Sequence, residues 1–165
     1  MNDPRSFAAC KLFAGNIVVS GGLGNNNASK TVESFNCFTG TWTLMPSMME
    51  RRIKHGLVAV RSNLFVFEGN NKLDGVDVIT SEVFDNICKK IVSFQLPISS
   101  YSISSYMVDI VSVGSKVFVF QDYTPAIIVY DVDKDEWEES RENKLNTHRV
   151  IRALSYLCVN KTEQK

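Results

Sequence analysis

The sequence has no excess of charge of either sign and no long apolar run. Lys and Arg together number 18, as do Asp and Glu, so the formal net charge at pH 7 is +0. Nucleic acids and anionic membranes attract basic surfaces, and this balance therefore excludes both as main partners. The sequence contains no apolar run of about 18 residues, which is the length that would predict a membrane-spanning helix. The first residues lack the basic-then-apolar order of a secretory signal, so we expect a cytoplasmic protein.

Cysteine pairs and histidine clusters are also missing. The chain contains no C-x-x-C pair and only two histidines, which argues against a zinc site and against a disulfide framework. Isolated thiols most often behave as small apolar side chains. We therefore expect this role for Cys10, Cys37, Cys88 and Cys158.

Catalytic signals are equally sparse. His55 and His148 both lie near a strand start, and no nucleophile elbow or third partner marks a catalytic set. A Ser–His or Cys–His pair stays open from sequence alone. We expect no catalytic residue and a protein that is not an enzyme.

Two stretches imitate ligand-binding loops. Gly21, Gly22 and Gly24 precede three asparagines, but the Gly-Lys-Ser/Thr of a phosphate loop and the helix-opening glycine of a dinucleotide loop are missing. The stretch 131–142 has the acidic spacing of a calcium loop, yet Glu136 stands where glycine permits the sharp turn. We therefore expect no cofactor and no metal.

What the chain does contain is a repeat of roughly 50 residues. Apolar stretches align at 17–22, 64–69 and 117–122. In each unit an aromatic residue then precedes a second bulky residue by seven positions, and such a pair can pack across a hairpin. The three pairs are Phe35 with Trp42, Phe84 with Ile91, and Tyr130 with Trp137. Arginines recur in register at Arg5, Arg52 and Arg149.

Each unit predicts four strands and no helix. Val, Ile, Phe and Tyr dominate short runs that are bounded by Gly, Asn, Asp and Ser. The predicted strands are 7–13, 16–20, 32–37 and 41–46; 56–61, 64–68, 79–85 and 90–95; and 106–113, 116–121, 127–132 and 136–140. A further strand is predicted at 150–159.

A double glycine after an apolar strand, an aromatic, a tryptophan seven residues later and then Met-Pro and Arg resemble the kelch repeat. The first unit matches at Gly21, Gly22, Phe35, Trp42, Met45-Pro46 and Arg52. The second keeps Gly69, Phe84 and Pro97, but has Glu68 and Ile91 in place of glycine and tryptophan. The third keeps Tyr130, Asp131 and Trp137, while Gln121-Asp122 replaces the glycines and Ser105 replaces arginine.

This resemblance implies an all-β fold, a partial kelch-type β-propeller of about three four-stranded antiparallel blades plus one extra strand. We expect a single domain over 1–165, with blades at about 5–50, 52–97 and 105–141 and a further first strand at about 149–160. Three blades fall short of the four to eight that close a ring. We therefore expect a piece of a longer chain, and association through uncovered blade faces.

By resemblance to kelch-like proteins, the chain is expected to be a non-enzymatic protein-interaction module, similar to the substrate-recognition part of a cullin-RING ubiquitin ligase adaptor. Contact with the cullin would then need domains outside this sequence. The alternatives are an actin-binding protein and, less favoured, a kelch-type oxidase, whose copper needs more histidines than two. Of the structural repeat residues named above, we expect the aromatic ones to be blade core: Phe35, Trp42, Phe84, Tyr130 and Trp137. The three arginines are expected to buttress neighbouring blades through hydrogen bonds to backbone or carboxylate. Rim-loop candidates for partner binding are Arg51, Lys54, Asn26, Asn71 and Tyr123.

Overall fold

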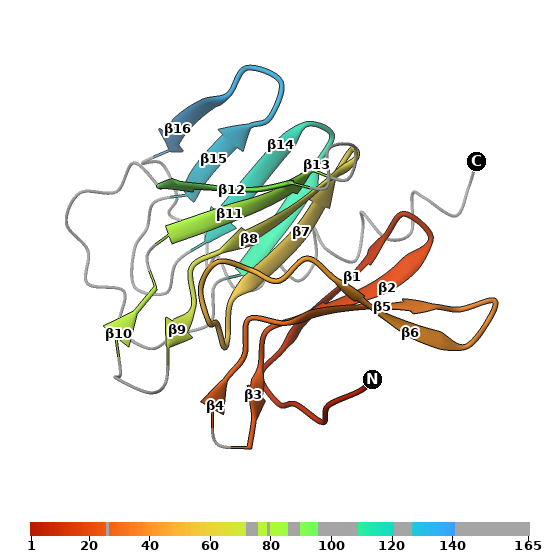
Figure 1. Ribbon diagram of the computed structural model, residues 1–165. Helices are drawn as coiled ribbons and strands as arrows, with labels where there is room; N and C mark the ends of the chain where they lie inside the picture. Colours follow the sequence, from red (N-terminus) through yellow and green to blue (C-terminus); the bar gives the residue numbers. More distant parts are fainter. Residues whose placement is uncertain are drawn as a thin grey trace. The chain divides into compact units, whose positions relative to one another are not determined.

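A computed structural model of the chain describes residues 1–25, 27–71, 76–78, 80–85, 90–95, 109–120 and 127–140 (Figure 1). The chain divides into two compact units, Met1–Val108 and Asp109–Lys165. No helix in the described part of the chain is long and apolar enough to cross a membrane.

Three antiparallel four-stranded sheets hold twelve of the described strands, and each is a blade of the expected kind. Blade 1 contains β1 (Ala9–Phe13), β2 (Asn16–Ser20), β5 (Val32–Asn36) and β6 (Thr41–Met45). Blade 2 contains β7 (Gly56–Val60), β8 (Asn63–Phe67), β11 (Thr80–Asp85) and β12 (Lys90–Gln95). Blade 3, in the second unit, contains β13 (Asp109–Val113), β14 (Lys116–Phe120), β15 (Ile127–Asp131) and β16 (Glu136–Ser140).

The all-β prediction is confirmed, and each of the twelve predicted blade strands has a counterpart with bounds within a few residues. The strands pair in chain order within each sheet, as tight turns dictate. In the β1–β2 turn both central residues, Ala14 and Gly15, have positive φ, of 49° and 77°. This is the turn type whose twist matches that of paired strands. The blade boundaries stay a prediction, and Arg149 and the strand at 150–159 lie outside the described residues.

Two short ribbons were not predicted. The loops between the second and third strands of blades 1 and 2 each form a hairpin whose two strands are two residues long. These hairpins are β3 (Leu23–Gly24) with β4 (Asn27–Ala28), and β9 (Asn70–Asn71) with β10 (Val76–Asp77). Both point to the same side of the first unit in Figure 1. Their sequences are too short and too rich in Gly and Asn to show a strand period.

The core of the first unit lies between blades 1 and 2. Phe13, Val18 and Val32 of blade 1 pack with Leu64 and Phe84 of blade 2. Phe13 meets Phe84 edge-on, with ring centroids 6.4 Å apart. Burial of this face therefore depends on both sheets at once.

The other face of blade 1 is open in the described structure. Leu12, Ile17, Phe35 and Trp42 are directly opposite one another across its four strands. Leu12 is 66% and Ile17 39% exposed, while Phe35 and Trp42 are half-buried. Phe35 and Trp42 do pack together, 4.9 Å between ring centroids. The expectation that they are core residues is corrected here, because no second sheet covers them among the described residues.

Blade 3 shows the same aromatic pair in its own unit. Tyr130 and Trp137 are paired across β15 and β16 and stack with ring centroids 4.5 Å apart. The Tyr130 hydroxyl donates to Asp135 Oδ1 at 2.5 Å, and burial raises the pKa of the phenol well above its usual range. Tyr130 is buried and Trp137 half-buried.

Candidate partner-binding rim

One edge of the first unit carries the two short hairpins and the segments that pair with them. We call this edge the rim; it comprises the hairpins β3–β4 and β9–β10 and the segments 5–7 and 49–55 that precede the first strand of each blade. Ser6 pairs with Leu23, and Ile53 pairs with Asn70. The same strand-like contact is thus made in both blades, 47 residues apart.

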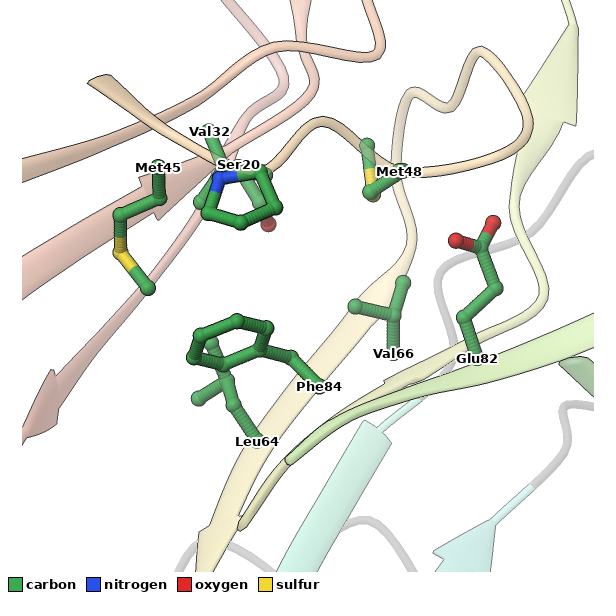
Figure 2. A pocket seen from close by; sticks show the side chains of 9 residues that line it. Ser20, Val32, Met45, Met48, Leu64, Val66, Glu82 and Phe84 are labelled. Atoms are coloured by element: carbon green, nitrogen blue, oxygen red, sulfur yellow. The ribbon is translucent and has the colours of Figure 1, made fainter. Parts of the chain in front are cut away.

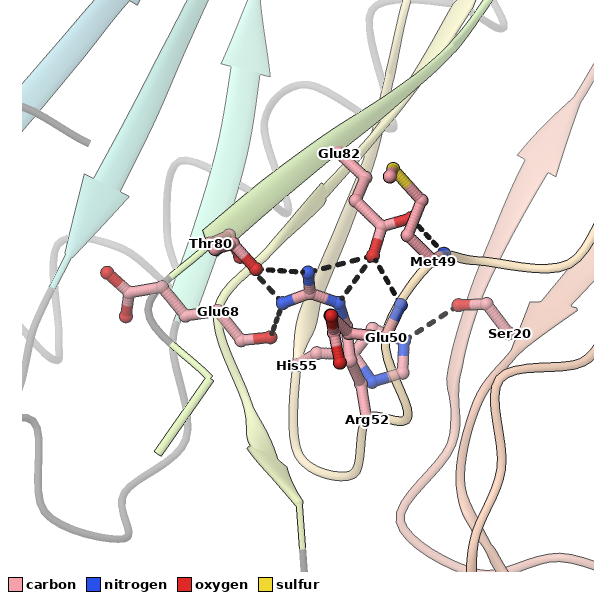
Figure 3. A network of polar contacts seen from close by, with 8 residues as sticks. All are labelled: Ser20, Met49, Glu50, Arg52, His55, Glu68, Thr80 and Glu82. Atoms are coloured by element: carbon pink, nitrogen blue, oxygen red, sulfur yellow. Dashed lines mark hydrogen bonds and ion pairs between the residues drawn. The ribbon is translucent and has the colours of Figure 1, made fainter. Parts of the chain in front are cut away.

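A buried arginine fixes the rim to blade 2 (Figure 3). Arg52 is fully buried, and its guanidinium donates to Glu82 Oε1 from Nε and Nη2 at 3.1 and 2.8 Å. Nη1 donates to the carbonyls of Glu68 and Thr80 at 2.7 and 2.6 Å. Burial lowers the pKa of Arg52, whereas the bonds to Glu82 and its charge oppose that shift. Such a pair is expensive to break because either partner alone would be a buried charge.

Blade 1 repeats this arrangement. Arg5 pairs with Glu33, and Arg5 Nη1 donates to the carbonyls of Gly21 and Thr31 at 3.0 and 3.2 Å. The glutamates also accept equivalent backbone bonds. The Asn2 amide donates to Glu33 and the Met49 amide to Glu82, both at 2.7 Å.

Sequence reasoning predicted the arginines' type of contact but missed both glutamates. The available signal was their position, since Glu33 and Glu82 each precede the repeat aromatic of their blade by two residues. Blade 3 has Ile128 there, and Ser105 at the arginine position. A repeat of this chain therefore has both the arginine and the glutamate, as in blades 1 and 2, or neither of them, as in blade 3.

The double glycine allows the rim to approach blade 1. Gly21 and Gly22 have φ of 58° and 94°, and the Gly22 amide donates to the Arg52 carbonyl at 2.8 Å. A Cβ on Gly21 would lie 2.4 Å from that carbonyl oxygen. Gly69, in the equivalent place of blade 2, has φ of 110° and equally little room. These glycines are required by the close approach and not by a ligand.

Beneath the rim, the fold brings together a Ser–His pair that the sequence left open. Ser20 Oγ and His55 Nε2 are 2.7 Å apart, and both residues are buried. Burial, and secondarily the charge of Arg52, lower the pKa of His55 to about 3, so the ring is neutral at physiological pH. Nδ1 has no hydrogen-bond partner among the described residues. Because Ser20 is 0% exposed, this pair joins blades 1 and 2 and is not a reachable nucleophile.

A small apolar pocket lies beside this contact (Figure 2). It encloses about 20 Å³, or about 320 Å³ when its open mouth is included. Its walls are Ser20, Val32, Met45, Pro46 and Met48 from blade 1 and the segment after it, and Leu64, Val66, Glu82 and Phe84 from blade 2. The enclosed part has room for about one water molecule.

The predicted binding residues lie on the rim where the structure describes them. Arg51 is exposed, and its Nη1 donates to the Ala28 carbonyl on β4 at 3.0 Å. Lys54 Nζ lies 5.6 Å from the ring of Phe7, which is 56% exposed. Asn71 is on β9, and its Oδ1 is buried with no hydrogen-bond partner in the described chain. Asn26 and Tyr123 lie outside the described residues.

Sequence reasoning missed Phe7. Phe7 and Lys54 occupy equivalent positions, and both have φ of 54°. Such a conformation is unfavourable for a residue with a Cβ, and strained exposed positions are concentrated at functional surfaces. Among the described residues, no group of three or more His, Cys, Asp or Glu side chains is placed to hold a metal.

Comparison with known protein families agrees with this geometry. The family model described as "Kelch motif" matches residues 4–49. Kelch-like protein 7 of Rattus norvegicus and of Mus musculus is 32% identical over 123 residues, which is 70% of this chain and 20% of the relative. The Homo sapiens protein is 40% identical over 58 residues. The chain thus spans about a fifth of the length of the rat and mouse relatives.

Among solved structures, that of YjhT superimposes with a TM-score of 0.68 at 16% identity, covering 86% of this chain and 53% of YjhT. At this identity the likeness shows the fold alone. The blades and the motif match define a kelch-type β-propeller fold, present in part. The chain contains one well-kept kelch repeat followed by degenerate ones, and it is similar to part of kelch-like protein 7.

Proposed function

We propose that this chain is a protein-interaction module that binds its partner through the rim of blades 1 and 2. The observation that supports this most is the strained pair of Phe7, which is exposed, and Lys54, which is half-buried, held in place by the two buried ion pairs Arg5–Glu33 and Arg52–Glu82. A rigid scaffold that presents an aromatic ring beside cationic groups is suited to a protein partner. Arg51 and Lys54 would contact acidic groups of that partner, and Phe7 would bury apolar surface.

More specifically, we propose that the module recognises substrates for a cullin-RING ubiquitin ligase in the cytoplasm. The resemblance to kelch-like protein 7 supports this role. Contact with the cullin would fall to other domains of a longer polypeptide. Recovery of the full-length transcript tests this part directly, since a cullin-binding domain encoded upstream would favour it.

The rim itself is tested by capture of partners from cell extract on the immobilised chain. A partner retained by the native chain and by Leu12→Ser, but lost with Phe7→Ser or with Arg51→Ala combined with Lys54→Ala, would support the rim. Leu12 is the matched control because it is at least as exposed as Phe7, 66% against 56%, but lies on the open face of blade 1. A partner lost with Leu12→Ser alone would move binding to that face. Co-sedimentation with actin filaments that depends on the same rim residues would instead favour the cytoskeletal alternative.

A further inference from the structure

The outer edge of blade 1 differs from that of blade 3 in charge. β6 is the end strand of its sheet and pairs with β5 alone among the described strands. Its sequence, TWTLM, carries no charge, whereas the corresponding β16, EWEES, is strongly acidic. At the equivalents of Thr43 and Phe38, blade 3 has Glu138 and Asp133. Charged residues protect sheet edges from pairing with other chains, so β16 is protected and β6 is not.

The turn before β6 presents an apolar side chain. Phe38 is 95% exposed, and the turn that carries it is fixed by its own hydrogen bonds. Asn36 Oδ1 accepts from the amides of Phe38 and Thr39, and the Gly40 amide donates to the Asn36 carbonyl at 2.8 Å. A phenyl ring held in water on an ordered turn is a ready anchor for an apolar pocket.

Such a pocket lies at the other end of the same strand. Met45, the last residue of β6, and Met48 lie across this pocket from Phe84 and Leu64 (Figure 2). Pro46, which follows β6, also lines it. Methionine side chains adapt readily to an inserted ring. A five-residue strand is roughly 17 Å long, so Phe38 and the pocket of one chain are at opposite ends of β6.

We propose that the partner of this edge is a second copy of the chain, bound by antiparallel pairing of β6 with β6. Pairing centred on Thr43 sets Thr43 opposite Thr43 of the second copy, and Thr41 opposite its Met45. The turn of each copy then reaches the pocket end of the other, and the Phe38 ring covers the pocket of the second copy, against its Met45 and Pro46. The arrangement is two-fold symmetric, so it closes at a dimer.

A charge introduced at position 43 by substitution provides the test. In sedimentation velocity across micromolar concentrations, the native chain should approach twice its mass of 18.5 kDa. Thr43→Glu and Thr43→Lys should each be monomeric, because like charges then face each other at the symmetry axis. An equimolar mixture of the two should dimerise again. Circular dichroism checks that each variant keeps its β-structure.

Phe38→Asp, which copies blade 3, should weaken dimerisation at least tenfold. Glu138→Lys, the matched edge change in blade 3, should leave it unchanged. A native chain that stays monomeric, or Thr43 variants that dimerise as before, would overturn the proposal. So would mass that keeps growing beyond a dimer. If association is lost in Leu12→Glu but kept in Thr43→Glu, self-association belongs to the open face of blade 1 and the proposal is wrong. If Phe38→Asp dimerises fully, the contact of Phe38 with the pocket is not part of the interface, and that part of the proposal is wrong.

Discussion

Blades 1 and 2 carry similar side chains on the same face of the sheet, but within the described residues only blade 2 has that face covered. Ile17 and Leu64 occupy equivalent positions, as do Phe35 and Phe84. Leu64 is 2% and Phe84 7% exposed because blade 1 packs over them, whereas Ile17 is 39% exposed. Burial of a repeat residue is therefore set by its neighbouring blade and not by its own sequence.

The two buried ion pairs, Arg5–Glu33 and Arg52–Glu82, by contrast do not depend on the neighbouring blade. Arg5 and Arg52 make the same contacts in both blades, although one blade is covered and the other is not. The guanidinium of each arginine bonds to acceptors of its own blade, so the expectation that these side chains buttress neighbouring blades is corrected. Each ion pair is therefore a local property of its repeat, since it forms in blade 2, which blade 1 covers, and also in blade 1, whose corresponding face is open in the described structure.

The largest loss of stability should come from breaking the buried ion pair of Arg52 and Glu82 in blade 2. We expect Arg52→Ala to destabilise the first unit by roughly 3–5 kcal/mol, because Glu82 is left as an uncompensated buried charge. Arg5→Ala should cost about as much, because Glu33 is also fully buried in the described structure. Urea denaturation of both variants measures the two losses. A much smaller loss for Arg5→Ala would mean that the ion pair of blade 1 depends on a cover over its open face.

A second test compares the two equivalent phenylalanines. Phe84→Ala should cost about 3–4 kcal/mol, since it empties the contact with Phe13 and enlarges the pocket. Phe35→Ala should cost roughly half as much, because its ring is already partly in water. If the Phe35 variant loses as much stability as the Phe84 variant, the open face of blade 1 is covered in solution.

The third test uses pH, because blade 2 has His55 where blade 1 has Ala8. The pKa of His55 is about 3 in the folded chain and near 6.5 when unfolded. The unfolded chain therefore takes up a proton first as pH falls. Stability due to neutral His55 is fully present above pH 6.5 and is lost as pH falls toward 3, by roughly tenfold in the folding equilibrium per pH unit.

Denaturation of the native chain and of His55→Asn, from pH 7 downward, checks this prediction. Asparagine keeps a polar group near Ser20 but does not titrate, so its profile below pH 6.5 should be flatter than the native one. Parallel profiles would show that the buried ring is not the group that titrates.

The sequence predicted the strands and the arginines' contact type because those depend on local pattern. Alternating apolar runs and turn residues specify the strands, and the repeat register points to Arg5 and Arg52. It missed what depends on neighbours in space. Ser20 and His55 are 35 residues apart and meet only because blades stack, and the half-exposure of Trp42 reflects an uncovered face. Phe7 was missed because a positive φ on phenylalanine has no signature in sequence.

The smallest effect concerns the strained rim positions, where the two blades should behave alike. Lys54 and Phe7 have the same φ of 54° although their blades differ in burial. Glycine accepts this conformation without steric cost, whereas alanine keeps the strain. We expect Lys54→Ala to lose about 0.5–1 kcal/mol, including its contact with the Phe7 ring. Lys54→Gly should stay within about 0.5 kcal/mol of the native chain. The pair Phe7→Ala and Phe7→Gly should show the same order in urea denaturation. Alanine as stable as glycine at either position would mean that the backbone relaxes there, and the strain would then no longer support a binding role for the rim.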